Sequence, residues 1–194
     1  MTDPKLILGS ASPRRREILH DAGFDFEVIP SDAEEVIDPQ YSPEEAVKEL
    51  ALQKLKPLSI NYPGDWIITS DTVVSKGNKI LGKPADFDEA KYMLQMLSGT
   101  THSVFSSICL SNGEVREVVA GKTRVYMRTL EEWEIAYYIQ NYEPYDKAGA
   151  YGIQEWIGMV GIEKIEGSYF TVMGLPVHLL YSLLLKHTGN SFLR

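Results

Sequence analysis

The longest β-rich part of this sequence folds back on itself. It consists of two runs, residues 102–111 and 115–128, which are separated by Asn112-Gly113. An Asn-Gly pair between such runs is a strong signal for the tight turn of an antiparallel hairpin. A shorter hairpin is predicted over residues 73–81, with its turn at Lys76-Gly77-Asn78. Because these hairpins interrupt the alternation that a parallel, doubly wound fold requires, the sequence predicts a mixed sheet.

Strand and helix signals alternate on either side of these hairpins. Strands are expected at residues 6–8, 24–29, 66–69 and 159–165. Helices are expected at residues 13–22, 43–58, 86–98, 130–142 and 176–186. Ser12-Pro13 and the capping box Ser42-Pro43-Glu44-Glu45 mark two of the helix starts. No linker rich in Pro, Gly or Ser interrupts the chain, so an α/β protein with a single domain over residues 1–194 is expected.

The composition limits the classes of protein to consider. The 194 residues are 44% hydrophobic and 24% charged, which excludes a disordered chain and a disulfide scaffold. A net charge of −8 argues against general nucleic-acid binding, and the lone Cys109 fits a reducing compartment. The longest mostly apolar stretch, residues 172–185, is too short to cross a bilayer, and residues 1–5 lack a secretory pattern. We therefore expect a cytoplasmic protein without membrane association.

A basic turn lies between the first predicted strand and the first helix. It reads Ser10-Ala11-Ser12-Pro13-Arg14-Arg15-Arg16. Three arginines in a first helical turn oppose the helix dipole, whereas a bound phosphate would make the dipole, the free N–H groups and the guanidinium groups all favourable. The alternative is a solvated basic turn with a good N-cap. The pattern favours phosphate binding. The sequence contains neither a P-loop motif nor a dinucleotide-binding motif.

Three further residues are weaker candidates when each is taken alone. Asp71, in Ser70-Asp71-Thr72-Val73, follows an apolar strand, where a carboxylate can hold a cation, accept a proton or only bond locally. Lys83 stands in the stiff connection Gly82-Lys83-Pro84. Lys54 lies within the apolar stripe of its helix, so it either snorkels to solvent or points into a polar cleft.

The glycine-rich segment at residues 146–154 contains a residue suited to hydrogen bonding with a nucleobase. Gln154 ends the segment Asp146-Lys147-Ala148-Gly149-Ala150-Tyr151-Gly152-Ile153-Gln154, and its amide both donates and accepts hydrogen bonds. An acidic loop either shares a metal with Asp71 or is simply solvated; it contains Asp32, Glu34 and Glu35. The four histidines lack the spacing of a zinc site; they are His20, His102, His178 and His187.

In order and spacing, these segments together with Gly174-Leu175-Pro176 resemble the Maf family of nucleoside triphosphate pyrophosphatases, also called septum formation proteins. The resemblance implies a Maf/inosine-triphosphatase-like fold, in which helices flank a mixed twisted β-sheet and a nucleotide cleft lies between two lobes. It also implies hydrolysis of a nucleoside triphosphate to the monophosphate and pyrophosphate. A divalent cation (Mg, Mn or Co), a homodimer and a role in nucleotide-pool housecleaning and septum formation are expected on the same basis.

The resemblance assigns a role to each matching residue. Asp71 is the expected proton acceptor, and Glu35 and Asp71 are the expected metal ligands. The expected phosphate-binding residues are Ser10, Arg14, Arg15, Lys54 and Lys83. Arg15, Thr72 and Gln154 match the branch that acts on dTTP and UTP. The alternatives are a 7-methyl-GTP pyrophosphatase of the same family and a non-catalytic nucleotide-binding regulator of cell division, although the presence of Asp71 favours hydrolysis.

Overall fold

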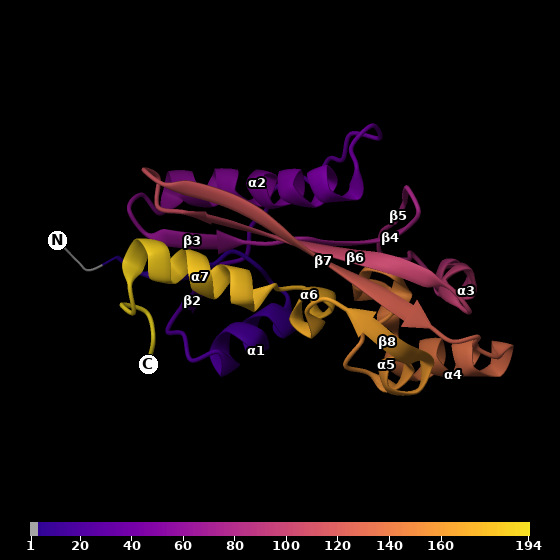
Figure 1. Cartoon of the computed structure of the whole chain (residues 1–194). Coiled ribbons are helices and arrows are strands. Elements are labelled where there is room, and N and C mark those ends of the chain that lie inside the picture. The colour runs from indigo at the N-terminus through magenta and orange to yellow at the C-terminus, as the bar shows by residue number, and fades with distance from the viewer. Residues whose placement is uncertain (1–3) are drawn as a thin grey trace. The chain divides into compact units, whose positions relative to one another are not determined.

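The computed structural model describes residues 4–194, so residues 1–3, part of the segment without a secretory pattern, lie outside it. The described chain is an α/β protein with one eight-stranded sheet (Figure 1). The elements in order are β1 (Leu6–Leu8), α1 (Pro13–Asp21), β2 (Glu27–Val28), α2 (Pro43–Asn61), β3 (Trp66–Thr69), β4 (Thr72–Lys76), β5 (Lys79–Leu81), α3 (Phe87–Leu97), β6 (Thr101–Ser111), β7 (Arg116–Met127), α4 (Glu132–Tyr142), the 3₁₀ helices η1 (Pro144–Asp146) and η2 (Ala148–Ala150), α5 (Trp156–Gly161), β8 (Ile162–Glu166), α6 (Tyr169–Met173) and α7 (Val177–Thr188).

The chain forms two compact units, each built from segments that are separated in the sequence. Unit 1 comprises residues 1–71, 106–121 and 174–194, of which the first three are not described. Unit 2 comprises residues 72–105 and 122–173. The long strands β6 and β7 have residues in both units. The mixed sheet flanked by helices that the sequence predicts is confirmed.

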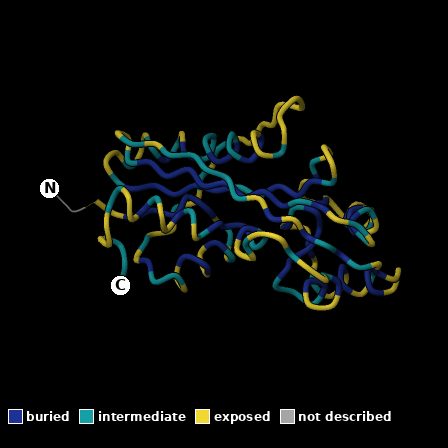
Figure 2. The backbone as a smooth tube through the Cα atoms, viewed as in Figure 1, coloured by how far each residue is buried: buried dark blue, intermediate teal, exposed yellow. Residues whose placement is uncertain are grey.

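In unit 1 the sheet centres on β1, which is parallel to both β2 and β3. Ile7 pairs with Ile67 of β3, and Ile68 of β3 pairs in antiparallel fashion with Leu110 of β6. The helix α2 lies on one side of these strands, and α1 and α7 lie on the other (Figure 1). With both faces covered, β1 and β3 are buried along their whole length (Figure 2), which explains their continuous apolar sequence.

Unit 1 also contains the single cysteine. Cys109 is buried with Ile67 and Leu55, and burial raises the pKa of its thiol to about 11. A thiol with such a pKa is almost entirely protonated near neutral pH and is therefore a poor nucleophile. Cys109 acts in this unit as a small core residue.

Unit 2 contains the β4–β5 hairpin, the antiparallel pair β7–β8, and the helices α3 to α6. The hairpin turns at Gly77, whose φ of 58° suits glycine, as the sequence predicts. The core of this unit gathers side chains from α3, α4 and α5, among them Leu94, Tyr138 and Ile157. At the surface of the same unit, the apolar side chains of Trp133 and Met159 are exposed.

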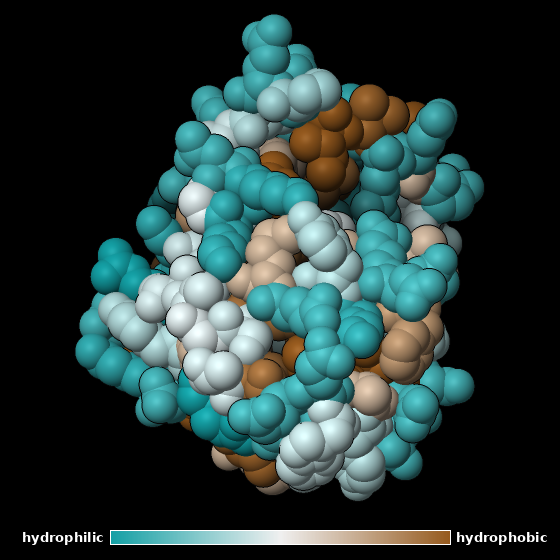
Figure 3. Space-filling model, turned by 90° about the vertical axis from the view of Figure 1, so that its right-hand side faces the viewer, coloured by the Kyte–Doolittle hydropathy of each residue, from teal (hydrophilic) through white to brown (hydrophobic). Residues whose placement is uncertain are grey.

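The face drawn in Figure 3 is hydrophilic over most of its area and carries a few hydrophobic patches. Within residues 4–194, no helix combines the length and hydropathy that a bilayer crossing requires.

Local signals place most element boundaries correctly. Ser42 and Glu45 form the predicted capping box at the start of α2, and the Asp86 side chain caps α3 through the Glu89 N–H. The second helix runs three residues beyond the predicted end at Leu58, with Pro57 inside it. The predicted strand at residues 24–29 is reduced to Glu27–Val28, because Phe24 bridges to Leu193 instead.

The prediction of a strand at residues 159–165 is wrong in its first half. Residues 159–161 form the end of α5, and the strand begins at Ile162. The N–H groups of Gly158 and Met159 both donate to the Glu155 carbonyl, which closes a helical turn. A Cβ on Gly158 would stand 1.9 Å from the Ile153 oxygen, so only glycine permits this turn. The short helix α6, Tyr169–Met173, was not predicted either.

Candidate active site

The centre of the candidate site in unit 1 is Asp71, two residues after the end of β3. Its backbone N–H donates to Ser107 Oγ at 3.3 Å, and its carbonyl accepts from the Ser107 N–H at 2.9 Å. Ser107 Oγ in turn donates to the Val47 carbonyl of α2 at 2.6 Å. The backbone of Asp71 is thus fixed by a neighbouring strand and indirectly by a helix. Its side chain is 13% exposed, so the carboxylate is largely shielded from solvent.

Arg15 approaches this carboxylate from α1. Its Nε donates to the Gly174 carbonyl at 2.9 Å, and its Nη1 donates to Ser10 Oγ at 3.1 Å. Its Nη2 stands 3.9 Å from Asp71 Oδ1, and the side chain is 10% exposed. Burial lowers the pKa of the guanidinium from its ordinary value, while the charge of Asp71 opposes this shift. Arg15 remains a cation, because the ordinary pKa of arginine lies far above neutral pH.

Lys54 approaches the same carboxylate from α2. Its Nζ lies 2.9 Å from Asp71 Oδ2 and 3.0 Å from Glu35 Oε1, and its side chain is 14% exposed. Lys54 therefore points toward two carboxylates, whereas a snorkelling lysine would point to solvent. One ammonium holds two carboxylates, from the loop after β2 and from the end of β3.

Two glycines allow the segments of this site to come together. A Cβ on Gly9 would lie 2.5 Å from Leu58 Cδ1 and 2.8 Å from Thr69 Cγ2, so a larger residue there would force these side chains to shift. Gly174, with a φ of 114°, presents one carbonyl to both Arg15 and Ser70, whose hydroxyl donates to it at 3.2 Å. The motif Gly174-Leu175-Pro176 therefore contributes backbone contacts to the site.

The other predicted site residues are distributed over both units. Arg14 lies half-buried on α1 in unit 1. In unit 2, Thr72 is half-buried at the start of β4, and Lys83 is exposed. The segment that carries Lys83 is fixed by the Gly149 N–H, which donates to the Gly82 carbonyl at 2.9 Å. The structure thus brings together Ser10, Arg15, Lys54, Glu35 and Asp71 within unit 1, while Thr72, Lys83 and Gln154 belong to unit 2.

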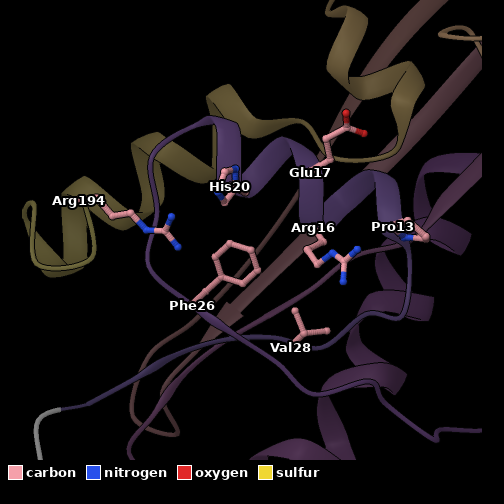
Figure 4. A pocket seen from close by; sticks show the side chains of 7 residues that line it. All are labelled: Pro13, Arg16, Glu17, His20, Phe26, Val28 and Arg194. Atoms are coloured by element: carbon pink, nitrogen blue, oxygen red, sulfur yellow. The ribbon is translucent and has the colours of Figure 1, made fainter.

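The third arginine of the basic turn lines a different pocket. Arg16 is exposed on α1, beside a cavity of about 440 Å³ in unit 1 (Figure 4). Its lining residues are Pro13, Arg16, Glu17, His20, Phe26, Val28 and Arg194. Arg194 lies 3.5 Å from Asp25, so this guanidinium already faces a carboxylate. The His20 ring lies 3.1 Å from Asp21. The adjacent residues Arg15 and Arg16 therefore lie in different environments: Arg15 is near Asp71, and Arg16 lines this cavity.

In unit 2, the segment that ends in Gln154 is held by an ionic and hydrogen-bonding network. Lys147 Nζ lies 3.0 Å from Glu155 Oε1, and the Tyr138 hydroxyl donates to Glu155 Oε2. The Gly152 N–H donates to the Tyr138 oxygen at 3.0 Å. Burial, followed by the hydrogen bond to Glu155, raises the pKa of the Tyr138 phenol, which keeps it a donor. Gln154 Oε1 is buried and has no hydrogen-bond partner among the described residues.

The donor set in unit 1 fits a divalent cation only in part. Glu35 and Asp71 supply carboxylate oxygens, the ligands that Mg²⁺ and Mn²⁺ prefer, and both surround one ammonium. Within residues 4–194, no cluster of three or more His, Cys, Asp or Glu side chains is arranged to hold a metal. The residues therefore fit a cation that takes its remaining ligands from water and phosphate oxygens, which is typical of Mg²⁺ bound with a nucleotide.

Sequence reasoning missed the residues that position the site. Ser107, the Gly174 carbonyl, Tyr138 and Glu155 were not assigned a role. The pair Ser106-Ser107 is a usable signal, because two adjacent buried hydroxyl groups in one strand need hydrogen-bond partners. Glu155 gives no such signal, since a glutamate at the start of a helix is ordinary.

Comparison with known proteins identifies the family. The sequence profile described as "Maf-like protein" matches residues 5–187. The chain belongs to the Maf family. A Maf relative from Flavobacterium psychrophilum, named dTTP/UTP pyrophosphatase, is 43% identical over 187 residues, which cover 95% of each chain. A relative with the same name from Bacteroides fragilis is 44% identical over 91% of this chain and 93% of its own. Another from Alkaliphilus oremlandii is 44% identical over 94% of this chain and 96% of its own.

A solved structure confirms the fold of this Maf protein. The Ham1 protein of Staphylococcus aureus superposes with a TM-score of 0.51 and covers 94% of this chain and 99% of its own, at 14% identity. At this identity, the similarity concerns the fold alone. The expected Maf/inosine-triphosphatase-like fold is thereby confirmed, while the nucleotide cleft between two lobes stays a prediction.

Proposed function

We propose that this chain is a nucleoside triphosphate pyrophosphatase that hydrolyses dTTP and UTP to the monophosphate and pyrophosphate. The observation that carries the proposal is the group of cations around one shielded carboxylate in unit 1. Arg15 Nη2 and Lys54 Nζ lie 3.9 Å and 2.9 Å from the two oxygens of Asp71. The names of the relatives, which share 41–44% of their residues with this chain, support the same activity.

The cations act on the phosphate chain of the substrate. A nucleoside triphosphate carries about four negative charges near neutral pH. Arg15 offers a planar guanidinium that is already oriented by Ser10 and Gly174, so little side-chain entropy is lost when it binds phosphate. Lys54 and Arg14 add charge from α2 and α1. The resemblance to the family adds Lys83 to this set. Their charge stabilises the pyrophosphate as the bond between the α and β phosphates breaks.

Asp71 acts on the water molecule. In the proposed reaction its carboxylate accepts a proton from a water that attacks the α-phosphorus, and pyrophosphate leaves. Ser107 helps to position this carboxylate, because it forms hydrogen bonds with both the N–H and the carbonyl of the Asp71 backbone. Substrate phosphates compete with Asp71 for Lys54, which frees the Asp71 oxygen at 2.9 Å to meet the water.

Glu35 and Asp71 are the residues proposed to hold the divalent cation. When bound, the cation neutralises phosphate charge and lowers the pKa of coordinated water. Glu35 faces Lys54 at 3.0 Å, and its carboxylate becomes available for this role once phosphate engages the lysine.

The reaction products test the proposal. The purified protein is incubated with dTTP, UTP, CTP, ATP or 7-methyl-GTP and with Mg²⁺, Mn²⁺ or Co²⁺, and monophosphate, pyrophosphate and orthophosphate are quantified. We expect UMP or dTMP in equal amounts with pyrophosphate, and higher kcat/KM for dTTP and UTP than for the other nucleotides. Release of orthophosphate with a diphosphate, or no turnover with any pair, refutes the proposal. A preference for 7-methyl-GTP would support the other branch.

The proposal extends to the setting in which the enzyme acts. A single catalytic domain over residues 1–194, a homodimer and a cytoplasmic location are what the resemblance to the family and the composition imply. Light scattering after size-exclusion chromatography measures the mass of the assembly. Fractionation of cells that produce the protein measures its location.

A further inference from the structure

The loop that carries Glu35 depends on contacts with the rest of unit 1 for its position. Residues 29–38 form neither helix nor strand, and residues 34–38 are all exposed, so this part of the loop buries little of its own surface. Such a segment samples many conformations unless hydrogen bonds hold it. The groups that hold it therefore control where the Glu35 carboxylate lies.

The side-chain amide of Gln53, on α2, holds this loop directly beside Glu35. Its Oε1 accepts from the Val36 N–H at 2.9 Å, and its Nε2 donates to the Val36 carbonyl at 2.8 Å. Nε2 also donates to Glu49 Oε1 at 3.3 Å, one turn earlier in α2. One amide thus engages both backbone groups of a single residue. The flipped amide would set donor against donor and acceptor against acceptor, so the clamp requires this orientation.

A second contact attaches the start of the loop to the same helix. Ser31 Oγ donates to the Lys54 carbonyl at 2.8 Å. Because Gln53 and Lys54 are adjacent, both ends of the segment 31–36 are attached to one turn of α2. The same turn directs Lys54 Nζ to within 2.9 Å of Asp71 Oδ2. The loop with Glu35 and the lysine are therefore positioned by one helix.

The contact between Glu35 and Lys54 is of a different kind. It joins two side chains, 3.0 Å apart, and Lys54 is the lysine proposed to bind substrate phosphate. When phosphate engages that lysine, Glu35 loses this partner just as its carboxylate is required for the cation. The hydrogen bonds from Gln53 join an uncharged amide to the backbone of Val36, so phosphate does not replace them in the same way.

We propose that Gln53 is a positioning residue, which keeps the Glu35 carboxylate at the cation site when Lys54 binds phosphate. The inference rests on the proposed function. Gln53 acts through the loop and not on the cation itself, so its contribution depends on the presence of the Glu35 carboxylate. Loss of its two hydrogen bonds with Val36 corresponds to a change of about ten-fold in the population of the positioned loop.

The test measures the affinity for inorganic pyrophosphate by calorimetry, with and without Mn²⁺. The difference between the two affinities reports the contribution of the cation, whereas the affinity without Mn²⁺ reports the phosphate-binding residues alone. We expect Gln53→Ala to weaken binding about ten-fold with Mn²⁺ and to leave binding without Mn²⁺ unchanged. Alanine is a good helix former, so the variant should fold, and its urea midpoint checks this.

A double-mutant cycle with Glu35→Gln tests whether Gln53 acts through Glu35. In the Glu35→Gln background, Gln53→Ala should cause no further loss, because the carboxylate that the loop positions is already absent. Gln53→Met keeps the length of the side chain without its polar atoms and should behave as Gln53→Ala does. Gln95→Ala is the matched control, because the exposed Gln95 amide donates to Glu132 in unit 2 at 3.3 Å, and both affinities should stay at the parent values.

The outcomes distinguish this inference from the proposed activity. An equal loss of affinity with and without Mn²⁺ overturns the inference, because it indicates general damage to the site. An additive loss in the double variant, or parent affinities in Gln53→Ala, also overturns it, even if the parent hydrolyses UTP. If the parent hydrolyses neither UTP nor dTTP, the proposed function fails, and the calorimetry still decides the role of Gln53. A parent whose pyrophosphate binding does not respond to Mn²⁺ overturns the inference, because Glu35 then holds no cation.

Discussion

The buried His102 predicts that unit 2 loses stability in mildly acidic solution. Its Nε2 lies 2.7 Å from the Tyr151 hydroxyl, and its Nδ1 has no partner among the described residues. The residue is 2% exposed. Burial, followed by the positive charge of Lys76, lowers the pKa of the imidazole from 6.5 to about 4. The folded protein therefore holds this ring in the neutral form.

The sign of the effect follows from the two pKa values. Above pH 6.5 the imidazole is neutral in both the folded and the unfolded chain, so His102 adds no pH dependence. Between pH 6.5 and 4 the unfolded chain binds a proton that the folded chain does not, and the free energy of unfolding falls. The loss is about 2 kcal/mol at pH 5 and about 3 kcal/mol at pH 4 for a shift of this size.

Urea unfolding of the parent and of His102→Gln at pH 7, 6 and 5 measures the effect. Glutamine can still bond to the Tyr151 hydroxyl but does not titrate, so the variant should lose about 2 kcal/mol less than the parent between pH 7 and 5. Carboxylates that titrate in the same range cancel in this comparison. His20→Gln, an exposed histidine beside Asp21, is the matched control and should behave like the parent. Equal losses in the parent and in His102→Gln would refute the reasoning.

Three further outcomes are expected. Asp71→Asn should lower kcat for dTTP by about 100-fold or more, the usual contribution of a general base, in a steady-state assay of pyrophosphate release; near-normal turnover would exclude Asp71 as the base. Gln154→Glu removes the NH₂ donor and adds a second acceptor, and should lower kcat/KM for UTP by about ten-fold. An unchanged UTP value would mean that other groups read the base. Gly9→Ala should lower the free energy of unfolding by about 1–3 kcal/mol, because the new methyl group would lie within 3 Å of Leu58 and Thr69. Gly82→Ala is its control, since a Cβ there meets nothing within 4 Å, and equal unfolding curves for the two variants would contradict the packing argument.

The sequence predicted which residues make up the candidate site, but only part of how they are arranged in space. Arg15 and Lys54 were singled out because each is a cation in an unexpected position, which suggests a bound anion. Asp71 was singled out because a carboxylate follows an apolar strand. The contacts of these three residues with one another depend on β3, α1 and α2 packing together. No local pattern contains that information, since Lys54 and Asp71 are 17 residues apart and Arg15 and Gly174 are 159 residues apart.

The amino-acid sequence by itself determined the features that depend on neighbours a few residues away. The capping box at Ser42 and the turns at Gly77 and Asn112-Gly113 follow from hydrogen bonds and backbone angles within about four residues, and each lies where it was predicted. The continuous apolar run of β1 likewise indicates a strand covered on both faces.

Only the tertiary structure decided features that depend on contacts between distant segments. The helical turn of α5 depends on the close approach of Gly158 to Ile153, which hydropathy does not record. The separation of Arg15 from Arg16 depends on the face of α1 that packs against the rest of unit 1, because successive helical residues point in directions about 100° apart. Burial of one guanidinium beside Asp71 and exposure of the next is therefore a property of the packed helix, and the sequence Arg14-Arg15-Arg16 is compatible with either assignment.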